Sequence, residues 1–143
     1  VGEYNSPKVR GVGTVGLCFG VSFGILYFFT MHHNSKIFVD EVDFISSPGY
    51  TADRSKYVPP PCMPPRRVFS PLGIFDFEQE SGFMRILSLH PGVSVAQVQA
   101  ATGFQVLVPS TVVETAPPSA IEIDVLRNRV DPDGLLRNLR ITH

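Results

Sequence analysis

The pattern of hydrophobic and polar positions predicts strands in the first and middle parts of the chain. The stretch ILYFFT at 25–30 is rich in aromatic and β-favouring residues, which is typical of a buried central strand. We therefore expect residues 15–31 to form a strand packed inside the core. Further along, 66–77 and 82–90 each fit one strand, and the acidic turn EQES at 78–81 joins them.

A short helix is predicted within the segment SLHPGVSVAQVQAATGF at 88–104. A Pro-Gly turn comes first, and Ser94 then forms a capping box with Gln97, three residues further on. The helix of about two turns ends at Gly103. The apolar stretch FQVLV at 104–108 predicts the next strand.

A second helix is predicted near the C-terminus. Ser119 and Glu122 repeat the capping box after two prolines, and the helix should end before the Asp-Pro pair at 131–132. One apolar face is supplied by Ile121, Val125 and Leu126. Strands that alternate with short helices indicate an α/β fold with a sheet.

Two connecting segments are expected to be less regular. Residues 34–49 mix apolar positions at helical spacing with β-branched residues, which indicates a short helix or an irregular turn. Residues 53–67 contain five prolines, so they predict an extended surface loop with polyproline character. Neither side of this loop is large enough to fold alone, and we expect one domain over 1–143.

Composition and charge narrow the choice of partners and compartment. The 143 residues include 12 basic and 13 acidic side chains spread along the chain, with a net charge of -1. This distribution offers no basic stripe for nucleic acid. Cys18 and Cys62 have no neighbours at metal-ligand spacing, so we expect neither a disulfide framework nor a metal site. Reduced thiols favour a cytoplasmic protein.

A membrane span is the alternative interpretation of residues 11–31. This run is uncharged and long enough to cross a bilayer, and Lys8 and Arg10 stand just before it. Three glycines also recur at four-residue spacing, namely Gly16, Gly20 and Gly24. However, each glycine lowers helix propensity by about 1 kcal/mol relative to alanine, so a buried strand is favoured over a membrane helix.

The titratable residues form no clear catalytic cluster in the sequence. His90 precedes the Pro-Gly turn and is expected to be a hydrogen-bonding turn residue, whereas His32 and His33 are expected to be solvated. Arg85 should pair with Asp76 or Glu78 across the hairpin. A polar face, rather than an acid/base pair, is expected from Asp40, Glu41 and Asp43.

Five segments in order resemble the β subunits of class I coenzyme A transferases, including the related ring-opening hydrolases. The first is SLHPGVSVAQVQAATGF, which is similar to the C-terminal signature of those subunits. The similarity extends from about Gly2 to Arg137. The other four segments are EYNSPKVRGVGTVG, VDFISSPGY, LGIFDF and LRNRVDPDGLLR.

The resemblance implies both a fold and a function. The fold is an open, mostly parallel sheet with short helices, of the NagB/RpiA-like coenzyme A transferase type. The chain would be the C-terminal half of a β subunit that works with an α subunit. The implied reaction moves CoA, present as an acyl-CoA thioester, between carboxylic acids through a glutamyl-CoA intermediate, with no metal. The alternatives are a hydrolase that opens a ring of a cyclic, steroid-derived CoA thioester, or an inactive fragment.

The resemblance also suggests which residues meet the substrate. The family's nucleophilic glutamate lies upstream of the region that this chain resembles, and Glu3 matches a different position. The glycine-rich loop would supply backbone N–H donors to the thioester oxyanion, because glycine lets the main chain approach closely. The expected substrate-binding residues are Gly11, Gly13, Ser47 and Gly49. A purely structural turn at Gly11 and Gly13 is the alternative.

Overall fold

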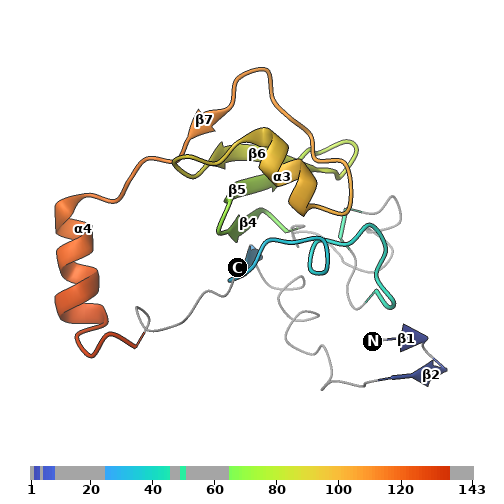
Figure 1. The fold of residues 1–143 in the computed structure, drawn as a ribbon, viewed down its shortest axis with the longest axis horizontal. Coiled ribbons are helices and arrows are strands. Elements are labelled where there is room, and N and C mark those ends of the chain that lie inside the picture. Colours follow the sequence, from blue (N-terminus) through green and yellow to red (C-terminus); the bar gives the residue numbers. More distant parts are fainter. Residues whose placement is uncertain (1, 4, 9–24, 46–48, 51–64, 136–143) are drawn as a thin grey trace.

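A computed structural model describes residues 2–3, 5–8, 25–45, 49–50 and 65–135. Their main feature is a five-stranded sheet with the order β3-β4-β5-β6-β7 (Figure 1). A separate two-stranded ribbon joins β1 (Gly2–Glu3) and β2 (Ser6–Pro7). The sheet strands are β3 (Tyr27–Phe29), β4 (Arg67–Ser70), β5 (Gly73–Phe77), β6 (Met84–Leu89) and β7 (Val113–Glu114).

The strand pairing is mixed. β3 with β4 and β6 with β7 are parallel, whereas β4 with β5 and β5 with β6 are antiparallel. The open α/β sheet with short helices is therefore confirmed, but the expectation of a mostly parallel sheet is not met within the described residues. The reason is that β4, β5 and β6 follow one another through tight turns, and only antiparallel strands can be joined in this way.

The segment 66–77 forms two strands, so its prediction as one strand is wrong. Pro71 cannot donate a backbone hydrogen bond, and a tight turn forms between Ser70 and Gly73, which face each other across the hairpin. Gly73 fits because a Cβ atom there would lie 2.4 Å from the carbonyl oxygen of Ser88. A close approach of β6 therefore requires glycine at this position.

The predicted acidic turn between β5 and β6 is confirmed. The carboxylate of Glu78 accepts hydrogen bonds from the backbone N–H and hydroxyl of Ser81, both at 2.7 Å, and from the N–H of Glu80 at 3.1 Å. These donors, Ser81 first, lower the pKa of Glu78 to about 2. Gly82 completes the turn with φ of +73°. Local side-chain hydrogen bonding thus fixes the hairpin register.

The hydrophobic core lies on one face of the sheet, where α3 (Val95–Ala101) covers it (Figure 1). The capping box of Ser94 and Gln97 is confirmed, since each side chain accepts a hydrogen bond from the other residue's backbone N–H. Phe75 at the centre is 0% exposed. The buried apolar residues are Val68, Phe75, Met84, Ile86, Leu89, Val98 and Val106.

Strand β3 lies at an edge of the sheet. A strand is confirmed at Tyr27–Phe29, but Tyr27 is 53% exposed and Phe29 is 74% exposed, so the prediction of a buried strand is wrong for these residues. Within the described sheet β3 pairs with β4 alone, which leaves its outer side open. Residues 15–24 lie outside the described residues. Among the residues that the structure describes, no helix is long and apolar enough to cross a membrane.

No strand forms at 104–108 as predicted, and the segment contains only one isolated β-bridge, between Leu107 and Arg85. Leu107 donates its N–H to the carbonyl of Met84 at 2.9 Å and accepts from the N–H of Ile86 at 3.0 Å. Pro109 follows closely and cannot extend the hydrogen-bond ladder. The short strand β7 pairs with β6 instead, and the sequence pattern did not predict it.

The C-terminal helix is confirmed as α4 (Ala120–Val125), followed by a π-helical turn, η1 (Leu126–Val130). Its capping box forms between Ser119 and Glu122, and the helical region ends before Asp131. The described part of 34–49 forms irregular turns, in which the N–H groups of Ile37 and Phe38 donate to the carbonyl of Asn34. Residues 53–64 of the predicted proline-rich loop lie outside the described residues.

Candidate functional site

Of the four predicted substrate-binding residues, only Gly49 lies within the described part of the chain. Gly11, Gly13 and Ser47 lie outside the described residues. Gly49 is half-buried, and a Cβ atom built there would meet nothing within 4 Å. Steric contacts at position 49 therefore do not require glycine.

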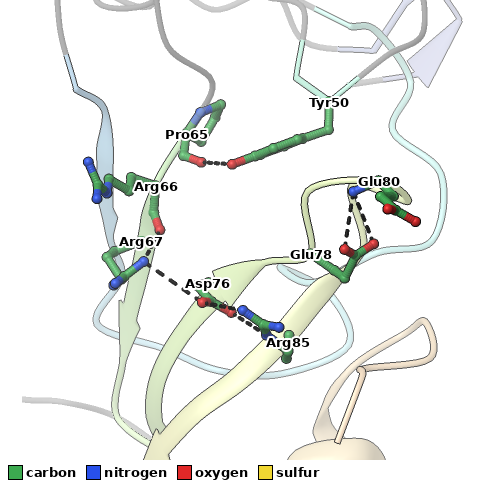
Figure 2. Close-up of polar contacts among 8 residues, drawn as sticks. All are labelled: Tyr50, Pro65, Arg66, Arg67, Asp76, Glu78, Glu80 and Arg85. Carbon is green, nitrogen blue, oxygen red and sulfur yellow. Dashed lines mark hydrogen bonds and ion pairs between the residues drawn. The ribbon is translucent and has the colours of Figure 1, made fainter. Parts of the chain in front are cut away.

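Tyr50 fixes the position of Gly49 next to it. The Tyr50 hydroxyl donates to the carbonyl of Pro65 at 2.8 Å (Figure 2). The Tyr50 ring also stacks on Phe77, with 5.1 Å between the ring centroids. Gly82 leaves room for this ring, because a Cβ atom there would lie 2.4 Å from the Cβ of Tyr50. Tyr50 is thus held against the tip of the β5–β6 hairpin, next to Gly49.

An apolar groove of about 670 Å³ begins at the same hairpin tip. Phe77 and Gly82, which Tyr50 contacts, both line it. Its polar lining residues are Thr30, Asp40 and Gln105. Pockets for small ligands have volumes of roughly 300–1,000 Å³ and a few polar groups in an apolar lining. Six aromatic rings dominate the groove, those of Phe28, Phe29, Phe38, Phe77, Phe83 and Phe104.

His33 lies at the centre of a polar network inside the molecule. Its Nδ1 atom is 2.7 Å from Oγ of Ser70, and its Nε2 atom is 2.9 Å from Oγ1 of Thr102. The Thr102 hydroxyl donates to the carbonyl of Val98 at 2.7 Å. The Ser70 oxygen accepts from the N–H of Leu72 at 3.2 Å. The prediction of a solvated side chain is therefore wrong for His33.

These contacts assign the proton on the His33 ring. The Thr102 hydroxyl hydrogen is used at Val98, so Thr102 accepts from Nε2–H of His33. Nδ1 is then unprotonated and accepts from the Ser70 hydroxyl. The ring also stacks on Phe38 at 3.9 Å. Burial disfavours the charged form and lowers the pKa of His33 to about 4, so the ring is neutral at pH 7.

The network positions chain segments and does not form a nucleophilic site. A serine that donates to histidine is the arrangement of an activated nucleophile, but Ser70 is 5% exposed. The second nitrogen of His33 bonds to Thr102 rather than to a carboxylate. The sequence signal for this network was indirect: Ser70 ends β4 and Thr102 caps α3, and such buried hydroxyl groups require partners.

The same network explains the conspicuous His-Pro-Gly and Thr-Gly-Phe motifs. Nε2 of His90 donates to the carbonyl of Ser70 at 3.1 Å, which confirms His90 as a hydrogen-bonding turn residue. Thr102 bonds to His33, as described above. Gly103 donates its N–H to the carbonyl of Phe38 at 2.7 Å, and a Cβ atom on Gly103 would lie 2.7 Å from that oxygen. Phe104 then packs against the core.

An ionic row crosses the sheet on the face opposite the core. Arg85 binds Asp76 with two hydrogen bonds, from Nε at 2.9 Å and Nη2 at 2.8 Å, which confirms the predicted pairing (Figure 2). Arg67 approaches the same carboxylate at 3.9 Å. The hydrogen bonds and charge of Asp76 raise the pKa of Arg85. The predicted polar face at 40–43 is exposed.

Replacing Asp76 with asparagine is expected to lower the free energy of unfolding by about 1–2 kcal/mol. The bidentate pair is lost, but the Arg85 side chain is 40% exposed, so the loss stays below that of a fully buried pair. Urea unfolding at pH 7 measures the change, with Glu80→Gln on the exposed turn as the control. Equal midpoints for the two variants would contradict this prediction.

Metal ligands do not gather in the described residues: no three His, Cys, Asp or Glu side chains lie together there.

No protein-family model matches the sequence. Comparison with individual known proteins finds relatives among the subunits of CoA-transferases and of a ring-cleaving hydrolase. The chain is 34% identical over 131 residues to the B-type subunit of 3-oxoadipate CoA-transferase from Pseudomonas knackmussii, covering 89% of this chain and 50% of that protein. It is 36% identical over 110 residues to the IpdB subunit of a cholesterol ring-cleaving hydrolase from Rhodococcus jostii, covering 72% and 41%.

The backbone agrees with these sequence relatives. The crystal structure of glutaconate coenzyme A-transferase from Acidaminococcus fermentans matches with a TM-score of 0.83 at 25% identity, covering 98% of this chain and 54% of that chain. The chain belongs to the coenzyme A transferase family. Another member of the same fold, IpdAB from Rhodococcus jostii, matches with a TM-score of 0.82 at 30% identity, covering 94% and 54%.

The fold of this chain does not by itself determine one reaction. The decarboxylase AibA/AibB shares the fold with a TM-score of 0.71 at 24% identity, covering 99% of this chain and 53% of that chain. The chain spans about half the length of the curated relatives that it matches. The family and fold are thus established, whereas the reaction and the substrate require separate arguments.

Proposed function

We propose that this chain is the C-terminal half of a coenzyme A transferase β subunit that acts on acyl-CoA thioesters with an α subunit. The observation that carries the proposal is the 34% identity to the B-type subunit of 3-oxoadipate CoA-transferase over 89% of the chain. In this proposal CoA is a substrate and no metal takes part. The enzyme would work in the cytoplasm.

The groove at the hairpin tip is the proposed site for the acyl group. Its aromatic lining suits an apolar acyl chain or ring, and Tyr50 packs against two of its lining residues, Phe77 and Gly82. Ser47 and Gly49 would contact the substrate from this side. Backbone N–H groups at Gly11 and Gly13 would stabilise the thioester oxyanion as it develops. The glutamate that accepts CoA would come from the other half of the β subunit.

The test of this proposal is an activity measurement on two preparations. The 143-residue chain alone should show no CoA transfer between acyl-CoA and a carboxylic acid. The chain joined to the missing half of its β subunit and mixed with an α subunit should show transfer. Turnover by the isolated chain would contradict the proposal, as would an inactive complete complex across a panel of acyl-CoA substrates with apolar chains, apolar rings and dicarboxylic acyl groups.

Replacing Gly13 with valine in that complete complex is expected to lower the rate of acyl transfer by roughly a hundredfold, because one oxyanion donor is displaced. Assembly, measured by gel filtration, should not change. Ala116→Val, at an exposed position of the extended segment before Pro117, serves as the control outside the proposed pocket. An unchanged rate in Gly13→Val would assign the loop to structure alone.

A ring-opening hydrolase is the second candidate, favoured by the 36% identity to the IpdB subunit. The two reactions leave different traces, because transfer passes through an enzyme-bound glutamyl-CoA thioester. Borohydride reduction followed by mass spectrometry of the complete complex would reveal that adduct. An adduct supports the transferase, whereas ring-opened product from a cyclic CoA thioester without an adduct supports the hydrolase.

A further inference from the structure

The groove at the hairpin tip has no basic side chain among its described lining residues. Asp40 carries the only charge in that described lining, and its sign is negative. Lys36, the basic residue nearest to Asp40 in the sequence, is exposed and does not belong to the described lining. A ligand in the groove therefore meets a negative charge that no cation of the described lining offsets.

The hydrogen bonds of the other polar lining residues leave acceptors rather than donors. The Thr30 hydroxyl donates to the carbonyl of His32 at 2.8 Å. The side-chain amide of Gln105 uses both hydrogens of Nε2, one for Oε1 of Gln99 at 3.2 Å and one for the carbonyl of Val106 at 3.3 Å. An ionised aspartate has acceptors alone. The polar side chains of the described lining therefore offer a ligand acceptors and no free donor.

The backbone beside Asp40 is held in place by contacts of Phe38, two residues earlier. The carbonyl of Phe38 accepts from the N–H of Gly103 at 2.7 Å, and its own N–H donates to the carbonyl of Asn34 at 2.9 Å. The Phe38 ring stacks on His33. Asp40 itself is exposed, and in the part of the chain that the structure describes no hydrogen bond or ion pair involves its carboxylate. An acceptor on an anchored segment is thus open to a ligand.

We infer that the groove prefers an apolar acyl group that ends in a hydroxyl over one that ends in a carboxylate, with Asp40 as the specificity-determining residue. This inference rests on the proposed function, because it takes the groove as the acyl site. A distal hydroxyl can donate to Asp40, whereas a distal carboxylate has no hydrogen to donate and carries the same charge. Such repulsion is a common source of specificity.

This preference would distinguish the chain from one of its relatives. The 3-oxoadipate CoA-transferase is named for a dicarboxylic acid, and binding a second carboxylate calls for donors or a cation. Neither is found among the side chains of the described groove lining. The reaction class and the acyl preference are therefore separate questions for this chain.

The test measures CoA transfer by the complete complex, in which this chain is joined to the missing half of its β subunit and mixed with an α subunit. Three substrates share one chain length and differ at the distal end: hexanoyl-CoA ends in a methyl group, ω-hydroxyhexanoyl-CoA in a hydroxyl and adipoyl-CoA in a carboxylate. The value of kcat/KM should be highest for the hydroxyl substrate and lowest, by about tenfold or more, for adipoyl-CoA. The difference should lie in KM, because the distal end is remote from the reacting bonds.

Two substitutions at Asp40 should change this preference. Asp40→Asn removes the charge and adds an N–H donor, so the ratio of kcat/KM for adipoyl-CoA to that for hexanoyl-CoA should rise about tenfold. Asp40→Arg should raise the ratio further, because a guanidinium binds a carboxylate with two hydrogen bonds. The matched control, Glu41→Gln, removes the same charge at an exposed residue outside the described lining and should leave the ratio unchanged. Gel filtration checks that each variant assembles.

The outcomes separate this inference from the proposed function. Equal ratios in the wild type and both Asp40 variants would overturn the inference, while the observed CoA transfer would still support the proposed function. A rise in Glu41→Gln as large as that in Asp40→Asn would also overturn it, because net charge would then set the preference. So would a wild type that prefers adipoyl-CoA, or one that uses none of the three substrates but turns over another acyl-CoA. Inactivity toward every acyl-CoA of the panel would contradict the proposed function and the inference together.

Discussion

Lowering the pH from 7 to 4 is expected to remove roughly 2 kcal/mol of the stability that His33 provides. Its pKa falls from 6.5 to about 4 on folding, so between these values the unfolded chain binds more protons than the folded chain. Stability is therefore fully present above pH 6.5 and declines as the pH falls toward 4. The full pKa shift of His33 corresponds to about 3 kcal/mol. The expected loss of roughly 2 kcal/mol is smaller because solvent partly reaches the His33 ring.

Urea unfolding at several values between pH 7 and 4 measures this dependence. His33→Ala should cost about 3 kcal/mol at pH 7, because Ser70 and Thr102 lose their partner and the stacking on Phe38 is lost. The variant should also lack the His33 contribution to the pH dependence. His32→Ala is the control. If wild type and His33→Ala lose stability in parallel from pH 6.5 to 4, the assignment of a buried neutral ring is wrong.

Replacing Phe75 with alanine is expected to lower the free energy of unfolding by about 4 kcal/mol, the usual cost of removing a buried phenylalanine. Phe75 is 0% exposed and pairs with Val68 on β4 and Ile86 on β6. Chemical denaturation at pH 7 measures the loss. The control is Phe83→Ala, because Phe83 is 61% exposed and should cost far less.

The Phe75 and His33 variants should not be additive. Their rings lie 5.4 Å apart, and residues in contact usually couple by about 0.5 kcal/mol or more. The double variant should therefore lose less stability than the two single losses together. Strict additivity would show that the packing between these rings contributes little.

The features that were predicted correctly depend on residues that lie close together along the chain. Both capping boxes and the Glu78 turn rest on hydrogen bonds between residues three or fewer positions apart. The Arg85–Asp76 pair was predictable because a hairpin turn sets which residues face each other. Family membership was also visible, because five motifs occur in a fixed order.

The errors arose where distant residues decide the outcome. His33 looked solvated because its partners, Ser70 and Thr102, come from elements far along the chain. Burial of β3 could not be predicted from its aromatic residues, because burial depends on whether a second neighbouring strand is present. The single strand predicted at 66–77 missed a turn in which Pro71 and Gly73 are the relevant residues. The substrate-binding prediction at Gly11, Gly13, Ser47 and Gly49 stays a prediction.

The long span of the His33 contacts has a consequence for folding kinetics. Strands β4, β5 and β6 are joined by short turns and can form early, since closing short loops costs little entropy. His33 reaches Ser70 across 37 residues and Thr102 across 69, so we expect these bonds to form after the hairpins. Interactions absent from the folding transition state act on the unfolding rate. We therefore expect the His33 contacts to act mainly on the unfolding rate of the protein, and the hairpins to act mainly on its folding rate.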